Sequence, residues 1–154
     1  MKKILYTTTL LLCLLISKED YAQSCSTMPN ALVSVTKQNV TGFRKIIFTF
    51  NKPLSSSFTM SPVTTVTSTY LDSDGSTVVT VPGCKFKSIT FKNAEWMCVT
   101  NNTVVADSRI KAVKLTEQFE GHITYRIGYC TSTYHHRSVV NTSTKRQIIL
   151  WFRN

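Results

Sequence analysis

Apolar and polar residues alternate with a period of two in several short segments of this chain. In the stretch FRKIIFTF, residues 43–50, the side chains of Ile46, Phe48 and Phe50 fall on one face. In the stretch ITYRIGY, residues 123–129, every second residue is Ile or Tyr. This alternation is typical of a β-strand with one buried face.

Other segments rich in β-branched residues predict further strands, and turn residues separate them. Asn51-Lys52-Pro53, the DSDG stretch and Pro82-Gly83 interrupt the pattern, and the polar segments 51–62 and 131–145 predict loops. No helical periodicity follows residue 24. We therefore expect an all-β domain, a β-sandwich of about eight or nine short strands. The further strands are predicted at residues 31–36, 63–70, 76–82, 85–91, 95–100, 109–115 and 147–152.

The beginning of the chain has a different character. After the basic start MKK, residues 4–16 are mostly apolar, and this run is shorter than the roughly 20 residues of a membrane-spanning helix. The segment predicts a secretory signal peptide, residues 1–23, followed by one domain over residues 24–154. Three charges separate the apolar run from Cys25, which disfavours a lipid anchor there. We expect a secreted or periplasmic protein with no transmembrane segment.

The chain is strongly basic, with a formal net charge of +10. Residues 1–23 hold three Lys and two acidic residues, so their removal takes away one positive charge and leaves +9. A basic exported domain favours an anionic partner, such as peptidoglycan or another anionic polysaccharide. Nucleic acid is disfavoured as a partner because no aromatic and glycine-rich RNA-binding motif accompanies the basic residues.

Four cysteines remain after the signal peptide: Cys25, Cys84, Cys98 and Cys130. An even number in an exported chain predicts disulfides. Three connectivities are open, and we favour Cys84 with Cys98, across one predicted hairpin, and Cys25 with Cys130. The chain has neither a CxxC pair nor a glycine-rich phosphate loop, so we expect no metal and no cofactor.

Four sequence blocks resemble the AMIN-like domain family of exported bacterial proteins, which is related to the AMIN domain. Residues 31–53 resemble the family's opening strands, and residues 74–91 resemble its middle block. Residues 119–129, FEGHITYRIGY, resemble its most distinctive block, in which F-E-G precedes an aromatic residue and then I-G. Residues 146–153 resemble the closing strand.

The resemblance implies a β-sandwich over nearly the whole exported chain. The AMIN-like family has no settled activity, whereas the related AMIN domain is associated with peptidoglycan binding and envelope targeting. This chain departs from the family in its cysteines and its basic charge. It also has Tyr125 where the family commonly has tryptophan, and Arg153 where an acidic residue is common.

The cluster Phe119-Glu120-Gly121-His122 allows three interpretations. Gly121 can turn the backbone into the following strand, with Glu120 as a local hydrogen-bond acceptor, and we favour this structural role. Glu120, His122 and Arg126 are alternatively candidates for binding sugar hydroxyls or an amine. Glu120 and His122 have the i,i+2 spacing that places two side chains on one face of a strand, which suits acid–base work. A glycoside hydrolase would need a second converging carboxylate.

A second set of candidate binding residues lies in the predicted loop 131–145. Tyr134, His135, His136 and Arg137 follow one another there, and loops on a rigid β-scaffold often carry binding.

The remaining large aromatic residues are expected in the core. Tyr125 and Tyr129 lie on the apolar face of their strand, and we also assign Trp96 and Trp151 to the interior.

Together these patterns favour an exported, non-enzymatic module that binds cell-wall glycan or another anionic envelope polymer. One alternative is a secreted hydrolase that uses Glu120 and His122. The other is a disulfide-stapled domain that binds another protein.

Overall fold

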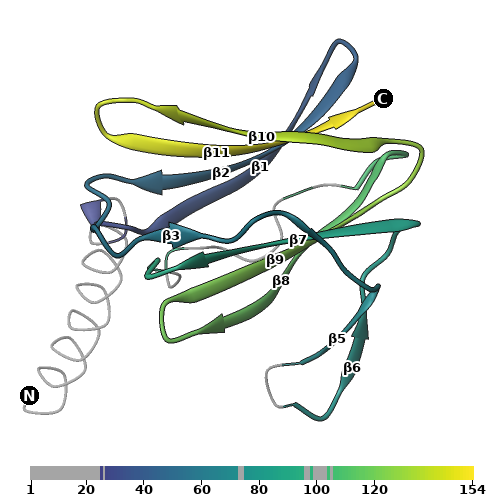
Figure 1. The fold of residues 1–154 in the computed structure, drawn as a ribbon, viewed down its shortest axis with the longest axis horizontal. Coiled ribbons are helices and arrows are strands. Elements are labelled where there is room, and N and C mark those ends of the chain that lie inside the picture. Colours follow the sequence, from purple (N-terminus) through teal and green to yellow (C-terminus); the bar gives the residue numbers. More distant parts are fainter. Residues whose placement is uncertain (1–24, 26, 73–74, 96–97, 99–103, 105) are drawn as a thin grey trace, which may run out of the picture.

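Two antiparallel β-sheets face each other across a shared apolar core (Figure 1). The structure is a computed structural model, and it describes residues 25, 27–72, 75–95, 98, 104 and 106–154. The predicted signal peptide, residues 1–23, lies outside the described residues. The all-β sandwich expected from the alternation of apolar and polar residues is confirmed. Among the described residues, no helix has the length and apolar character needed to span a membrane.

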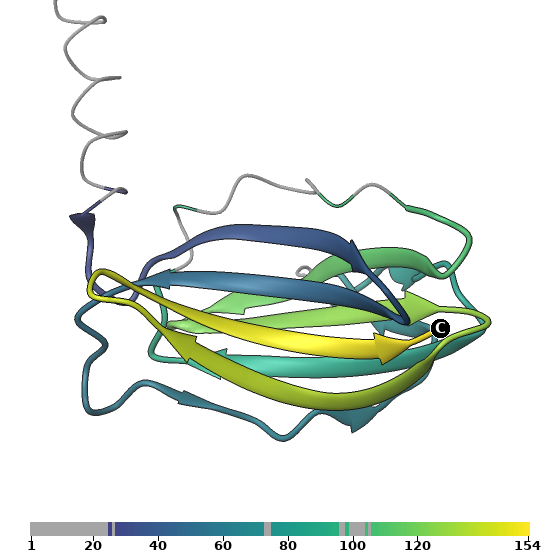
Figure 2. The ribbon, with the colours of Figure 1, turned by 90° about the horizontal axis from the view of Figure 1, so that it is seen from above.

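The first sheet has four strands in the order β1-β2-β11-β10. They are β1 (Leu32–Val40), β2 (Phe43–Asn51), β10 (Thr133–Asn141) and β11 (Lys145–Arg153). All neighbouring strands are antiparallel. Seen from above, the four strands form one layer over the second sheet (Figure 2).

The second sheet has the order β3-β7-β9-β8, and β4 also pairs with β7. Its strands are β3 (Thr59–Met60), β4 (Thr64–Thr65), β7 (Lys85–Lys92), β8 (Ile110–Phe119) and β9 (His122–Tyr129). Because β3 and β4 pair with successive parts of β7, they form an interrupted edge of this sheet.

A separate two-stranded hairpin consists of β5 (Thr69–Leu71) and β6 (Val78–Thr80). It projects beyond the second sheet, on the side away from the first sheet (Figure 1). The single strand predicted over residues 63–70 is therefore divided between β4 and the start of β5.

Aromatic side chains fill the centre of the core. Phe48 of β2 lies between Phe91 of β7 and Tyr125 of β9, with ring centroids 5.1 and 5.0 Å apart. Tyr129 of β9 contacts Phe152 of β11 at 5.0 Å. Burial raises the pKa of Tyr125, as expected for a phenol in an apolar interior. Both tyrosines that the sequence assigns to the core are buried.

The loop predicted over residues 131–145 and the core position predicted for Trp151 both differ from the structure. The segment 131–145 was expected to be a loop, but most of it forms β10. β10 is an edge strand with mostly exposed side chains, so it lacks the apolar alternation that identifies a half-buried strand. Trp151, assigned to the core, points away from it because its neighbours Leu150 and Phe152 both belong to the core cluster. Trp96 lies outside the described residues.

The four cysteines form two disulfides, Cys25–Cys98 and Cys84–Cys130. The pairing favoured from the sequence is therefore wrong. Cys84 precedes β7 and Cys130 follows β9, and the register pairs Lys85 with Tyr129, so the two cysteines are cross-strand neighbours. Their Cα atoms are 4.9 Å apart, within the usual range for a disulfide.

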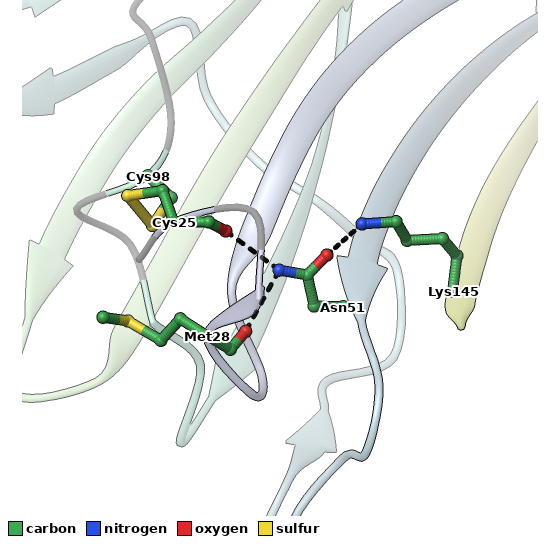
Figure 3. The surroundings of a disulfide bond; sticks show 5 residues. All are labelled: Cys25, Met28, Asn51, Cys98 and Lys145. Atoms are coloured by element: carbon green, nitrogen blue, oxygen red, sulfur yellow. Dashed lines mark hydrogen bonds between the residues drawn. A yellow bond between two sulfur atoms is a disulfide. The ribbon is translucent and has the colours of Figure 1, made fainter. Parts of the chain in front are cut away.

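The other disulfide joins the start of the domain to Cys98, in the connection that follows β7 (Figure 3). Nearby, the side-chain amide of the buried Asn51 donates to the backbone carbonyls of Cys25, at 2.9 Å, and Met28, at 3.1 Å. Lys145 donates to the carbonyl oxygen of the same amide. Because the sulfur of Cys25 is bonded to Cys98, it is not free to carry a lipid.

Candidate functional site

The outer face of the first sheet carries a continuous cluster of aromatic and cationic side chains. Since Ile46 and Leu150 are buried in the core, the adjacent Lys45 and Trp151 point outward. The register pairs Trp151 with Lys45 on one side and with His136 on the other. We call this set the Trp151 cluster; it comprises Phe43, Lys45, His135, His136, Trp151 and Arg153.

Ring contacts connect the cluster across three strands. His136 of β10 stacks on Trp151 of β11, with ring centroids 5.4 Å apart and an interplanar angle of 13°. The ring of Phe43 of β2 meets the ring of Trp151 edge-on, with centroids 5.6 Å apart. It also contacts the ring of His135 at the same centroid distance, tilted by 38°. The indole N–H of Trp151 donates to the Ser138 hydroxyl at 2.8 Å, which fixes the orientation of the ring. The result is an aromatic surface held on rigid strands.

Two cations lie against these rings. The Lys45 ammonium is 4.2 Å from the centroid of Trp151, and the Arg153 guanidinium is 5.8 Å from the centroid of Phe43. Both distances are within the range of cation–π attraction. His135, His136 and Arg153 are exposed, whereas Phe43, Lys45 and Trp151 are partly exposed. The cluster is therefore open to a large ligand.

The charge of this sheet is one-sided. The four strands of the first sheet contain no Asp or Glu. Asp107, which precedes β8, binds Lys37 at 2.8 Å and approaches Arg44 at 3.6 Å. These are the two salt bridges found in the described part of the chain. The strands of the sheet carry seven basic residues: Lys37, Arg44, Lys45, Arg137, Lys145, Arg146 and Arg153.

The four candidates from the predicted loop separate into two groups on β10. His135 and His136 belong to the outer cluster. Tyr134 instead packs against the core beside Phe152, at 5.7 Å, and burial raises the pKa of its hydroxyl, partly opposed by the charge of Arg137. Arg137 donates to the carbonyl of Ser61 at 2.9 Å, across the edge of the sandwich.

Glu120 and Gly121 form the two-residue turn between β8 and β9. Their φ angles are 47° and 76°, and Phe119 pairs with His122 to close the hairpin. Glu120 is therefore not part of the strand, so the pair Glu120 and His122 does not have the extended i,i+2 geometry assumed from the sequence. In the described part of the chain, no hydrogen bond or ion pair joins these two side chains.

Arg126 lies on the outer face of β9 and is engaged in a structural contact. Its guanidinium donates to the backbone carbonyls of Thr67, at 3.1 Å, and of Thr69. The same group lies 5.4 Å from the ring of Tyr70. Arg126 thus holds the β5–β6 hairpin against the second sheet, far from the Trp151 cluster.

The sequence pattern did not indicate Phe43, Lys45, Trp151 or Arg153 as site residues. Ile148, Ile149 and Leu150 are consecutive apolar residues, so the pattern before Trp151 did not show which face of the strand is buried. The pairing of Trp151 with Lys45 of β2 and His136 of β10, between the core residues Leu150 and Phe152, shows that Trp151 faces outward. Within the described part of the chain, no group of three His, Cys, Asp or Glu residues is arranged to hold a metal ion.

Comparison with protein-family models, with curated proteins and with solved structures gave no match. The resemblance to the AMIN-like family stays a prediction from the sequence blocks.

Proposed function

We propose that this protein is an exported, non-enzymatic binding domain that holds an anionic polymer of the cell envelope, such as a cell-wall glycan, on the outer face of the first sheet. The single observation that carries the proposal is a four-stranded sheet without acidic residues whose outer face bears the Trp151 cluster. The predicted signal peptide and the two disulfides support action outside the cytoplasm.

The charge distribution supports a polyanion as the ligand. Lys45 and Arg153 lie beside aromatic rings instead of carboxylates, so their charge is not neutralised by a neighbour on this face. A surface of one sign raises the local concentration of ligands of the opposite sign. The attraction extends over about 10 Å at moderate salt and is weakened by more salt.

The aromatic rings supply a contribution that salt does not remove. Rings of Trp151, His136 and Phe43 present apolar surface at the centre of the patch. Aromatic and Arg side chains at the centre of an interface commonly dominate its binding energy. The combination suits a polymer that has both apolar C–H surface and acidic groups, as an anionic polysaccharide does.

The test is co-sedimentation of the exported protein with insoluble peptidoglycan that retains its anionic polymers, at two salt concentrations. Trp151→Ala should reduce retention about tenfold at both, because it removes the central ring. The double variant Lys45→Gln with Arg153→Gln should reduce retention mainly at low salt, because it removes only charge.

The matched control is the double variant Lys92→Gln with Lys114→Gln, which makes the same change in net charge on the second sheet. It should retain most of the binding. Equal losses in the two double variants, with normal retention of Trp151→Ala, would show that binding follows net charge alone and would refute the assigned site.

A further inference from the structure

A groove of about 500 Å³ lies between the β5–β6 hairpin and the outer face of the second sheet. Tyr125 and Ile127 of β9 point into the core, so the alternate residues Thr124 and Arg126 point to the outer face of the second sheet. The groove is therefore separate from the proposed polymer-binding face, which is the outer face of the first sheet. A volume of this size is typical of ligand sites in proteins. We call it the hairpin groove; the lining residues used below are Tyr70, Leu71, Glu117, Phe119, Thr124 and Arg126.

Apolar side chains are unusually exposed at this groove. Leu71 is 58% exposed and Phe119 is 65% exposed, and both line it. Val78 is 64% exposed and is the cross-strand partner of Leu71 on the hairpin. These three are among the five large apolar side chains that are exposed in the described part of the chain. An apolar patch rimmed by polar groups is typical of an interaction site.

The groove also holds a carboxylate without a basic partner. Glu117 accepts a hydrogen bond from the Thr124 hydroxyl at 2.8 Å, and no salt bridge within the described residues involves it. Arg126 lines the same groove, but its guanidinium is directed to the carbonyls of Thr67 and Thr69. In a chain with 18 basic and 8 acidic residues, Glu117 therefore remains available to a cation from outside.

We propose that the hairpin groove binds a segment of a partner protein that carries a Lys or Arg residue next to an apolar residue. The basic group would pair with Glu117, and the apolar neighbour would cover Leu71 and Phe119. The aliphatic stem of Lys or Arg adds apolar contact of its own, which suits a groove with both kinds of wall. The groove uses other residues than the polymer-binding face, and its ligand would carry the opposite charge. Binding at one site can therefore be refuted without affecting the proposal for the other.

The test is an NMR titration of the isotope-labelled protein with the peptide acetyl-Leu-Lys-Leu-amide. The comparison peptides replace Lys with norleucine, which keeps the apolar stem without the charge, or with Glu. The Lys peptide should shift the backbone amides of residues 70–71 and 116–119. The norleucine peptide should bind about fivefold more weakly, as expected for loss of a partly exposed ion pair, and the Glu peptide should bind more weakly still.

Two acidic positions provide a matched pair of variants. Glu117→Gln should weaken binding of the Lys peptide about fivefold and leave the norleucine peptide unaffected. Glu120→Gln makes the same charge change in the exposed turn outside the groove, and should leave both unaffected. Phe119→Ser should weaken both peptides. Trp151→Ala should bind the Lys peptide like the wild type, whatever its retention on peptidoglycan.

Three results would overturn the proposal. The first is equal affinity of the wild type for the Lys and norleucine peptides. The second is equal loss of Lys-peptide affinity in Glu117→Gln and Glu120→Gln. The third is an absence of shifts at residues 70–71 and 116–119 with the peptide, while a neutral oligosaccharide shifts them.

Discussion

At the scale of single residues, the backbone conformation of the turn between β8 and β9 explains the F-E-G motif. Positive φ at both Glu120 and Gly121 is the pattern of a type I′ turn, which matches the twist of a β-hairpin. The Gly121 carbonyl also accepts a hydrogen bond from the Ala94 amide at 2.9 Å, so the turn supports the connection that leaves β7. The F-E-G motif therefore has a structural explanation that requires no ligand.

Gly121→Val should destabilise the protein by about 1–3 kcal/mol, because valine resists the left-handed backbone conformation. The φ of Gly121 is +76°, and an added Cβ would also lie 3.4 Å from the Cα of Asn93. Chemical denaturation would measure the difference in the free energy of unfolding. A variant as stable as the wild type would show that this backbone conformation is not required.

Glu120→Asn should have the opposite effect and stabilise the protein by about 0.5–1 kcal/mol. Glu120 has a φ of 47°, a region that Asn tolerates better, and Asn-Gly is the preferred pair in type I′ turns. The same denaturation measurement applies, with Glu120→Gln as the control that removes the charge without this backbone preference. Equal stability of the Asn and Gln variants would contradict the explanation.

At the scale of elements, the long edge strands are all irregular. β1, β10 and β8 each contain a register shift relative to the neighbouring strand. A bulge interrupts the row of unpaired backbone groups at a sheet edge, and so hinders addition of a foreign strand. Ligand binding through the faces of the sheets fits this architecture better than binding through their edges.

Peptide mapping of the unreduced protein should find Cys25 linked to Cys98 and Cys84 linked to Cys130, with no free thiol at these four positions. Replacing Cys84 and Cys130 with Ala should lower the free energy of unfolding by about 2–4 kcal/mol, mostly by releasing the unfolded chain from a constraint. Any other connectivity in the map would contradict the arrangement of β7 and β9.

Local alternation of apolar and polar residues predicts some of these elements and not others. Alternation correctly identified β2 and β9, because the alternating apolar residues of each strand face the core. It failed at β10, whose edge position leaves polar residues on both faces. The disulfide pairing and the outward position of Trp151 depend on which strands become neighbours, and a local pattern does not contain that information.

At the scale of the whole molecule, Asp107 connects the two sheets. Its carboxylate accepts hydrogen bonds from Lys37 of β1 at 2.8 Å and from the backbone amides of Arg109 and Ile110 near the start of β8. Burial raises the pKa of Asp107, but the hydrogen bonds and charge of Lys37 and the two backbone bonds outweigh it and lower the pKa from 3.8 to about 2.

A lowered pKa in the folded state means that Asp107 stabilises the fold above pH 3.8, and that this stabilisation is lost as the pH falls towards 2. The wild type should exceed Asp107→Asn in the free energy of unfolding by about 1–2 kcal/mol at pH 5. The difference should shrink between pH 4 and pH 2. Denaturation of both proteins across this range would check it, and a constant difference would contradict the role of the charge.

The one-sided charge of the first sheet has a consequence for how the molecule approaches a surface. Its strands carry seven basic residues and no acidic one, whereas the strands of the second sheet carry six basic residues and Glu117. Two more acidic residues, Asp72 and Glu120, directly follow β5 and β8. The strands of the first sheet therefore sum to +7 and those of the second sheet to +5, so positive charge is denser on the first sheet. Within a Debye length of a negatively charged wall, this difference favours the orientation in which the first sheet faces the wall. In a layer of such molecules, that orientation would direct the β5–β6 hairpins away from the wall and towards the surrounding medium (Figure 1).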